Sequence, residues 1–264
     1  MLFKLELRRY SRTLFALMTL TAVLLMQGCF WESDDPAPTP DADATGYYTG
    51  TISVVGFDDT TTVHALINDN HLMLMSMTQG VLYDGTMTIT GNSFTSTAKI
   101  YNDGIDTTAT TAITGTITAG SQMTGEMTGD SIGSGSFTLT YATSNSETAA
   151  VSRITTGAGY WLEYLYGDDS AWTSFKVDLP NSIVSDGGFS AGVFDNCDIS
   201  SGATITPVSG TNLYSVSLAL NTCTGPNQEY TGLATSLSLS AADDTIMMAI
   251  TGAGYAIIGK FEKN

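Results

Sequence analysis

Basic residues are scarce in this sequence. Lysine and arginine together number 9, against 26 aspartates and glutamates, and the formal net charge is −17. Phosphate backbones and anionic lipid surfaces are bound by clusters of Lys and Arg. Beyond position 28 the basic residues form no such cluster; they are Lys99, Arg153, Lys176, Lys260 and Lys263. The sequence therefore excludes nucleic acid as a partner.

Histidine is rarer still, which restricts acid–base catalysis. The chain contains only His64 and His71. Residues 129–133 read GDSIG and fit the G-x-S-x-G pattern, but a nucleophile elbow needs a strand, a turn and a helix, with a histidine later in the chain. Because both histidines precede Ser131, we expect this serine to lie in a turn. We predict no catalytic residue, no cofactor and no enzymatic activity.

No apolar run is long enough to cross a bilayer as a helix. The longest covers residues 13–26, about 14 residues where roughly 20 are needed. It follows a short segment that contains four of the nine basic residues, and this order is typical of a secretory signal peptide. Without residues 1–28 the chain keeps 5 basic and 25 acidic residues, a net charge of −20.

The end of this segment resembles the lipobox of bacterial lipoproteins. Residues 24–29 read LLMQGC, with a glycine directly before Cys29. The resemblance implies a lipoprotein signal peptide at 1–28 and lipidation of Cys29, where each buried methylene contributes about 0.8 kcal/mol of membrane affinity. Phe30, rather than aspartate, follows the cysteine, which implies an outer-membrane anchor with the body in the periplasm or at the cell surface. A plain secretory signal with an unmodified Cys29 is the alternative.

Cysteine is limited to three residues in the chain. If Cys29 carries lipid, Cys197 and Cys223 are left as a pair in an exported body, where disulfides persist. We therefore predict a Cys197–Cys223 disulfide. Two thiols without a nearby histidine are too few for a cysteine-based metal site.

Half of the six prolines lie close together, between the lipobox and the body. Residues 33–45 read SDDPAPTPDADAT, with few apolar side chains. Proline-rich acidic segments favour extended conformations of about 3.1 Å per residue. We expect residues 29–45 to form a tether that holds the body away from the membrane.

The rest of the chain has the pattern of an all-β protein, and no segment predicts a helix. Short alternating runs rich in Thr, Val, Ile and Tyr are separated by Gly, Asn and Asp. The runs in the first half are 47–54, 61–67, 72–77, 86–90, 93–100, 107–118, 122–127 and 135–141. We expect turns between them at 68–70, 83–85, 91–92 and 102–104.

The body reads as two similar halves, 46–145 and 155–264. Gly46-Tyr47-Tyr48 opens one half, Gly159-Tyr160-Trp161 lies near the start of the other, and Gly-x-Phe wording recurs near both ends. We predict two tandem antiparallel meander barrels or sandwiches of lipocalin-like size, following the signal peptide and tether. One continuous sheet wrapped from both halves, or a membrane-spanning barrel, are the alternatives.

One strand carries an unusual set of side chains. In the run HLMLMSM a period of two places His71, Met73, Met75 and Met77 on one face. Imidazole and thioethers are ligands for Cu(I), which makes these residues weak candidates for a copper site. Methionine more commonly fills cores or lines apolar pockets. We expect a core or pocket role and predict no metal.

The second half resembles a group of uncharacterised proteobacterial outer-membrane lipoproteins. The resemblance rests on Asn196–Gly202, on Asn212–Leu218, on Cys223 and on Tyr230–Ala234, and it covers residues 189–261 best. It implies a lipid anchor, two tandem β domains and a disulfide in the C-terminal half. It implies no activity.

These observations predict a non-enzymatic lipoprotein of the outer membrane. Its β body would be a scaffold or a binding module for an envelope partner. The alternative is a lipocalin-like carrier of a small apolar ligand, and a periplasmic copper-binding protein is less favoured. A barrel of about eight strands can be filled by side chains or hollow, so its interior discriminates between a module and a carrier.

Overall fold

The computed structural model describes most of the body and leaves the N-terminal segment aside. The described residues are 40–57, 61–143, 148–154, 161–164, 172–178, 182–184, 188–189, 194, 197–223, 227–237 and 245–263. Asp41–Asn264 form one compact unit. The predicted signal peptide at 1–28, Cys29 and most of the predicted tether lie outside the described residues.

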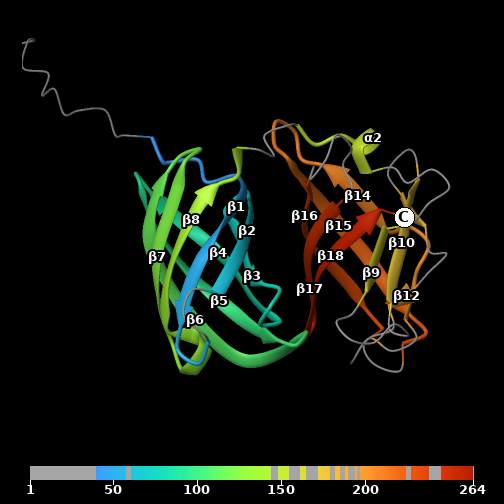
Figure 1. Ribbon diagram of the computed structural model, residues 1–264, viewed down its shortest axis with the longest axis horizontal. Coiled ribbons are helices and arrows are strands. Elements are labelled where there is room, and N and C mark those ends of the chain that lie inside the picture. Colours follow the sequence, from blue (N-terminus) through green and yellow to red (C-terminus); the bar gives the residue numbers. More distant parts are fainter. Residues whose placement is uncertain are drawn as a thin grey trace, which may run out of the picture. The chain divides into compact units, whose positions relative to one another are not determined.

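The first eight strands close into an antiparallel barrel (Figure 1). They follow one another as a meander, and β1 pairs with both β2 and β8, so the barrel has no free edge. The strands are β1 (Gly46–Val54), β2 (Thr61–Asn68), β3 (His71–Ser76), β4 (Val81–Thr90), β5 (Ser93–Asn102), β6 (Ile105–Thr118), β7 (Gln122–Thr128) and β8 (Gly135–Tyr141).

Alternation along each strand builds the barrel core. In β5 every second residue from Phe94 to Ile100 is buried, while Thr95, Thr97 and Lys99 face outward. Large side chains fill the interior, including Tyr48 and Tyr83, which are fully buried. Burial raises the pKa of both tyrosines, so they stay neutral and pack as apolar rings with a hydroxyl.

Glycines in the barrel wall make room for two of these rings. Gly115 and Gly125 are cross-strand partners on β6 and β7. A Cβ on Gly115 would lie 2.6 Å from Phe94, and a Cβ on Gly125 would lie 2.5 Å from Phe137. The two phenylalanines therefore pack where side chains are missing, an arrangement that lets a sheet coil tightly.

Both ends of the barrel are covered. At one end the chain entering β1 crosses the mouth (Figure 1), where the Ala42 amide donates to the Gly91 carbonyl at 2.8 Å and Ala44 is buried against the core. At the other end lies the 3-10 turn η2 (Ser131–Gly133). The Tyr83 hydroxyl donates to the Ile132 carbonyl at 2.7 Å, which fastens η2 to the interior.

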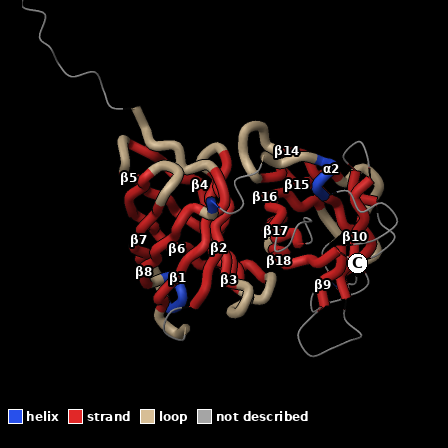
Figure 2. Tube along the Cα trace, turned by 45° about the horizontal axis from the view of Figure 1, so that its top comes forward, coloured by secondary structure: helices blue, strands red, loops and turns tan. Residues whose placement is uncertain are grey.

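Ten further strands follow, with one helical turn, α2 (Val151–Ile154). The strands dominate this part of the chain as well (Figure 2). They are β9 (Trp161–Tyr164), β10 (Trp172–Asp178), β11 (Ser182–Val184), β12 (Gly188–Phe189), β13 (Cys197–Ile199), β14 (Thr204–Pro207), β15 (Leu213–Asn221), β16 (Glu229–Leu237), β17 (Thr245–Gly252) and β18 (Tyr255–Lys263).

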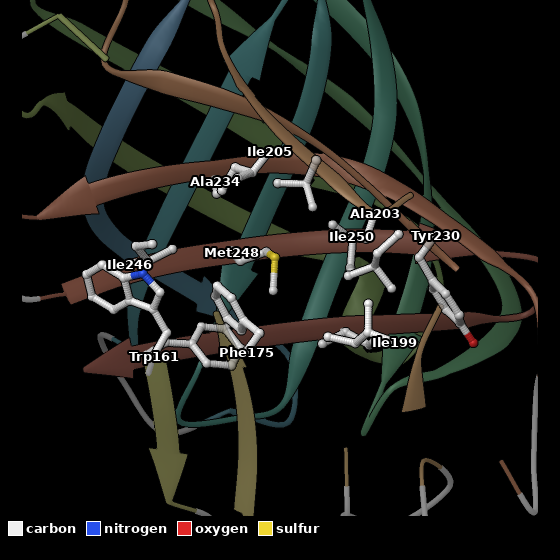
Figure 3. Packing of buried hydrophobic residues seen from close by; sticks show 14 of the residues in the cluster. Trp161, Phe175, Ile199, Ala203, Ile205, Tyr230, Ala234, Ile246, Met248 and Ile250 are labelled. Atoms are coloured by element: carbon white, nitrogen blue, oxygen red, sulfur yellow. The ribbon is translucent and has the colours of Figure 1, made fainter. Parts of the chain in front are cut away.

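The pairing of these C-terminal strands returns to its starting point. It runs from β9 through β10, β11, β14, β15, β16 and β17 to β18, which pairs again with β9. A second core lies among them, with Trp161 beside Phe175 and both facing Met248 (Figure 3). The Cys197–Cys223 disulfide belongs to this core and confirms the predicted pairing.

The barrel and the C-terminal strands are joined by backbone and by side chains. Tyr255 of β18 pairs with Ile105 of β6, so all 18 strands belong to one hydrogen-bonded network. A third hydrophobic cluster, here called the seam, draws residues from both parts. Its buried members are Tyr47, Leu66, Met73, Met75, Leu82, Tyr101, Ala142, Leu213, Leu233, Leu237, Met247, Ala249 and Ala256.

The all-β prediction is confirmed, and the eight runs predicted in the first half all coincide with barrel strands. One predicted turn is wrong: Tyr83, Asp84 and Gly85 lie inside β4. Contacts with other strands and with η2 hold these residues in β4. The Tyr83 hydroxyl donates to η2, Asp84 faces outward beside β3, and Gly85 leaves room for the Ser96 side chain. The chain instead turns at 77–80, where Gly80 has a φ of 63°.

Candidate functional site

The methionine face of β3 lies in the seam. Met73 and Met75 are fully buried there, and Met77 packs against the same cluster from beyond the end of the strand. Their neighbours include Leu233 and Met247 of the C-terminal strands. The structure thus brings three of the four predicted residues together on an apolar surface, and their surroundings are those of a core.

His71, the fourth residue of that face, points to a carboxylate instead. Its Nε2 lies 2.6 Å from Asp84 Oδ1, and the Asp84 side chain is only 15% exposed. The other carboxylate oxygen accepts a hydrogen bond from the Thr251 hydroxyl at 2.8 Å. Asp84, on β4, therefore links β3 to β17, although 167 positions of sequence separate it from Thr251, and its orientation is determined from both sides.

The second histidine lies at the seam border. His64 Nδ1 is 2.8 Å from the Tyr47 hydroxyl, and the two rings are stacked at 6.0 Å. Burial, assisted by the charge of Lys260, lowers the pKa of His64 below its ordinary 6.5. Burial raises the pKa of Tyr47 to about 12. At neutral pH the pair is therefore uncharged.

Acidification is expected to destabilise the fold through His64. In the window between its lowered pKa and 6.5, the unfolded chain binds a proton that the folded chain excludes, so the free energy of unfolding falls as the pH drops. Urea unfolding at about pH 7.5 and about pH 5 should show a smaller loss in His64→Gln than in the parent. An equal loss in both proteins would contradict this assignment.

A hollow of about 750 Å³ lies on the outer wall of β3, β4, β5 and β6. Asp84 and Lys99 contribute its charged groups, and His71 lies beside Asp84. Lys99 is the cross-strand partner of Asp84 and also lies 3.7 Å from Asp106. The remaining polar side chains are Ser96 and five threonines: Thr86, Thr88, Thr95, Thr97 and Thr114.

Local sequence explains why the wall is hollowed here. The register of β5 against β6 shifts between Lys99 and Tyr101, and such irregularities bend a strand and increase its twist. Ala112 places only a methyl group beside Thr97, its partner on β5. A bent wall with a small side chain between longer ones leaves the depression.

The G-x-S-x-G segment forms the expected turn. Residues 131–133 are the 3-10 turn η2, and strands β7 and β8 flank it. The Gly133 amide donates to the Asp130 carbonyl at 2.9 Å. A nucleophile elbow requires a helix after the turn, and β8 occupies that position.

No family model and no curated protein matches the chain. In the described part of the chain, no group of three or more His, Cys, Asp or Glu side chains is placed to hold a metal ion. No described helix is long and apolar enough to cross a membrane. The barrel and the hollow are therefore the features that bear on function.

Sequence reasoning missed Asp84, Thr251 and the threonine lining. Asp84 was assigned to a turn, and its contact with Thr251 has no local signal. The outward threonines follow the period of two expected of any solvated strand face. Two apolar runs could have revealed the seam, since Leu72–Met75 and Ile246–Ile250 are apolar on both strand faces, and strands buried on both faces show such runs.

Proposed function

We propose that the protein is a non-enzymatic lipoprotein, anchored in the outer membrane through Cys29, whose β body is a scaffold or a binding module for an envelope partner. The observation that carries the proposal is the filled and covered barrel. Its interior holds fully buried Tyr48, Tyr83 and other large side chains, with the entering chain over one end and η2 over the other. A binding role then belongs to the outer surface rather than to an enclosed pocket.

Two further features favour an exported body. The lipobox wording precedes a cysteine, and Cys197 and Cys223 form a disulfide of the kind that persists in oxidising compartments. The proposal includes two tandem β domains, at 46–145 and 155–264. Support for this division comes from the two separate cores and from the pairing that returns to its first strand in each part.

Anchoring is tested by following acyl chains in a Gram-negative host. Cells producing the full chain are fed an alkyne-labelled palmitate, and their membranes are separated by density. Label is expected in the outer-membrane fraction with the parent, whereas Cys29→Ala should lose the label and leave the membrane fraction, because two or more acyl chains are needed for stable anchoring. The matched control is Cys197→Ser with Cys223→Ser, which keeps Cys29. Label retained by Cys29→Ala would contradict the anchor.

The carrier alternative predicts that a bound ligand adds to the mass of the folded protein. Native mass spectrometry of the full chain should show the polypeptide, its lipid and one disulfide, with no other stoichiometric adduct. A second organic adduct that is released on denaturation would contradict the filled barrel and favour the carrier.

A further inference from the structure

The two charged groups of the hollow, Asp84 and Lys99, have opposite signs. Asp84 faces His71 at 2.6 Å and has Lys99 as its cross-strand partner, while Lys99 lies 3.7 Å from Asp106. An incoming anion would meet Asp84, and an incoming cation would meet Lys99. The hollow therefore selects for neither sign of charge.

The lining has few aliphatic side chains and no aromatic ones, and its apolar surface includes the methyl groups of the threonines. Ala112 and Ile113 are its aliphatic residues, and none of the described lining residues is Trp, Tyr or Phe. Aromatic ring systems are held largely by stacking on aromatic side chains, which this surface does not offer. That class of ligand is disfavoured on this ground.

Hydrogen-bonding capacity is plentiful. Each threonine hydroxyl can donate one bond and accept others, and in the described part of the chain none of the five in the hollow has a side-chain partner. The two oxygens of Asp84 each accept one bond, from His71 and from Thr251, and carboxylate oxygens have capacity for more. The hollow thus presents free hydroxyls beside a carboxylate that is already oriented.

We propose that this hollow binds a neutral, hydroxyl-rich glycan. Sugar hydroxyls both donate and accept, so they match the threonines, and they donate to carboxylates in charge-assisted bonds. Asp84 would anchor one sugar unit while the threonines of β4, β5 and β6 follow the chain along the wall. The inference rests on the proposed role as a binding module and names the ligand class of that module.

Affinity electrophoresis of the full lipidated chain tests the site. Native gels contain one of three neutral polysaccharides, namely glycogen, hydroxyethylcellulose or galactomannan, with a non-glycosidic detergent so that no detergent sugar competes. The acidic chain migrates well, and an uncharged polysaccharide slows it only by binding. At least one polysaccharide is expected to retard the parent, with affinity reduced about tenfold in Asp84→Asn and several-fold in Thr95→Val.

The matched control is Thr138→Val, which removes an exposed hydroxyl from β8, outside the hollow. It should leave the retardation unchanged, and far-ultraviolet circular dichroism should show all variants folded. Thr95 is exposed, so its replacement is expected to preserve the fold even if Asp84→Asn weakens it.

Two results would overturn the glycan site: no retardation by any of the three polysaccharides, or equal retardation of Thr95→Val and the parent. The outcome is independent of anchoring. If the chain incorporates palmitate but is retarded by no polysaccharide, the glycan site is contradicted and the anchored binding module is not. If the chain is retarded but carries no lipid, the anchor is contradicted and the glycan site is not.

Discussion

Replacing Trp161 by alanine is expected to lower the free energy of unfolding by about 3–5 kcal/mol, the range measured for large aromatic side chains deleted from cores. The indole is fully buried and donates from Nε1 to the Ile154 carbonyl at 2.9 Å. Its strand, β9, lies between β10 and β18, so Trp161 is located where the C-terminal pairing returns to its first strand. Deletion leaves both a cavity and an unpaired carbonyl.

Trp161→Phe separates the two contributions. Phenylalanine keeps a ring against Phe175 but cannot donate to Ile154, so its cost should approach that of one unmet buried acceptor, about 1–3 kcal/mol. Urea unfolding followed by far-ultraviolet circular dichroism compares the three proteins without relying on tryptophan fluorescence. An alanine variant less than about 1 kcal/mol below the parent would show that this position is not part of the folded core.

The barrel strands could be predicted from the sequence because each is a local feature. A period of two in Ser93–Ile100 requires only that one strand face is buried, and the turn residues around it provide the boundaries. The disulfide was predictable for a similar reason, since two thiols in a body that is predicted to be exported have few other uses. Neither inference depends on how distant strands meet.

The predicted turn at Tyr83, Asp84 and Gly85 failed because tertiary contacts override local preference. Asp and Gly usually form turns, but Asp84 is held between His71 and Thr251, and a Cβ on Gly85 would lie 2.7 Å from the Ser96 hydroxyl. These partners are far away in sequence. A residue whose role is a contact with a distant part of the chain does not fit a local periodic pattern. For that reason Asp84 and the hollow could not be predicted from the sequence.

The methionine face illustrates the same limit. The period of two correctly places Met73 and Met75 on one face of β3. The same sequence pattern would arise whether that face binds a metal or packs into a buried interface. The role of the two methionines depends on the surface that packs against them, which is formed by Leu233, Met247 and other residues of the C-terminal strands. The seam also makes the barrel and the C-terminal strands dependent on each other, because separating them would expose this cluster.

Met75→Ala should therefore destabilise the protein by about 2–5 kcal/mol, whereas Met75→Leu, which conserves volume, should cost less than about 1.5 kcal/mol. Met75 is fully buried, so alanine leaves a cavity that its neighbours cannot fill without moving. Urea unfolding measures both variants, and titration with Cu(I) measures the second property of this face. If the thioether acts as a packing group, Met75→Leu binds no less copper than the parent. A leucine variant that keeps its stability but loses copper binding would instead assign the thioether to a metal, since leucine replaces the volume of methionine and not its sulfur.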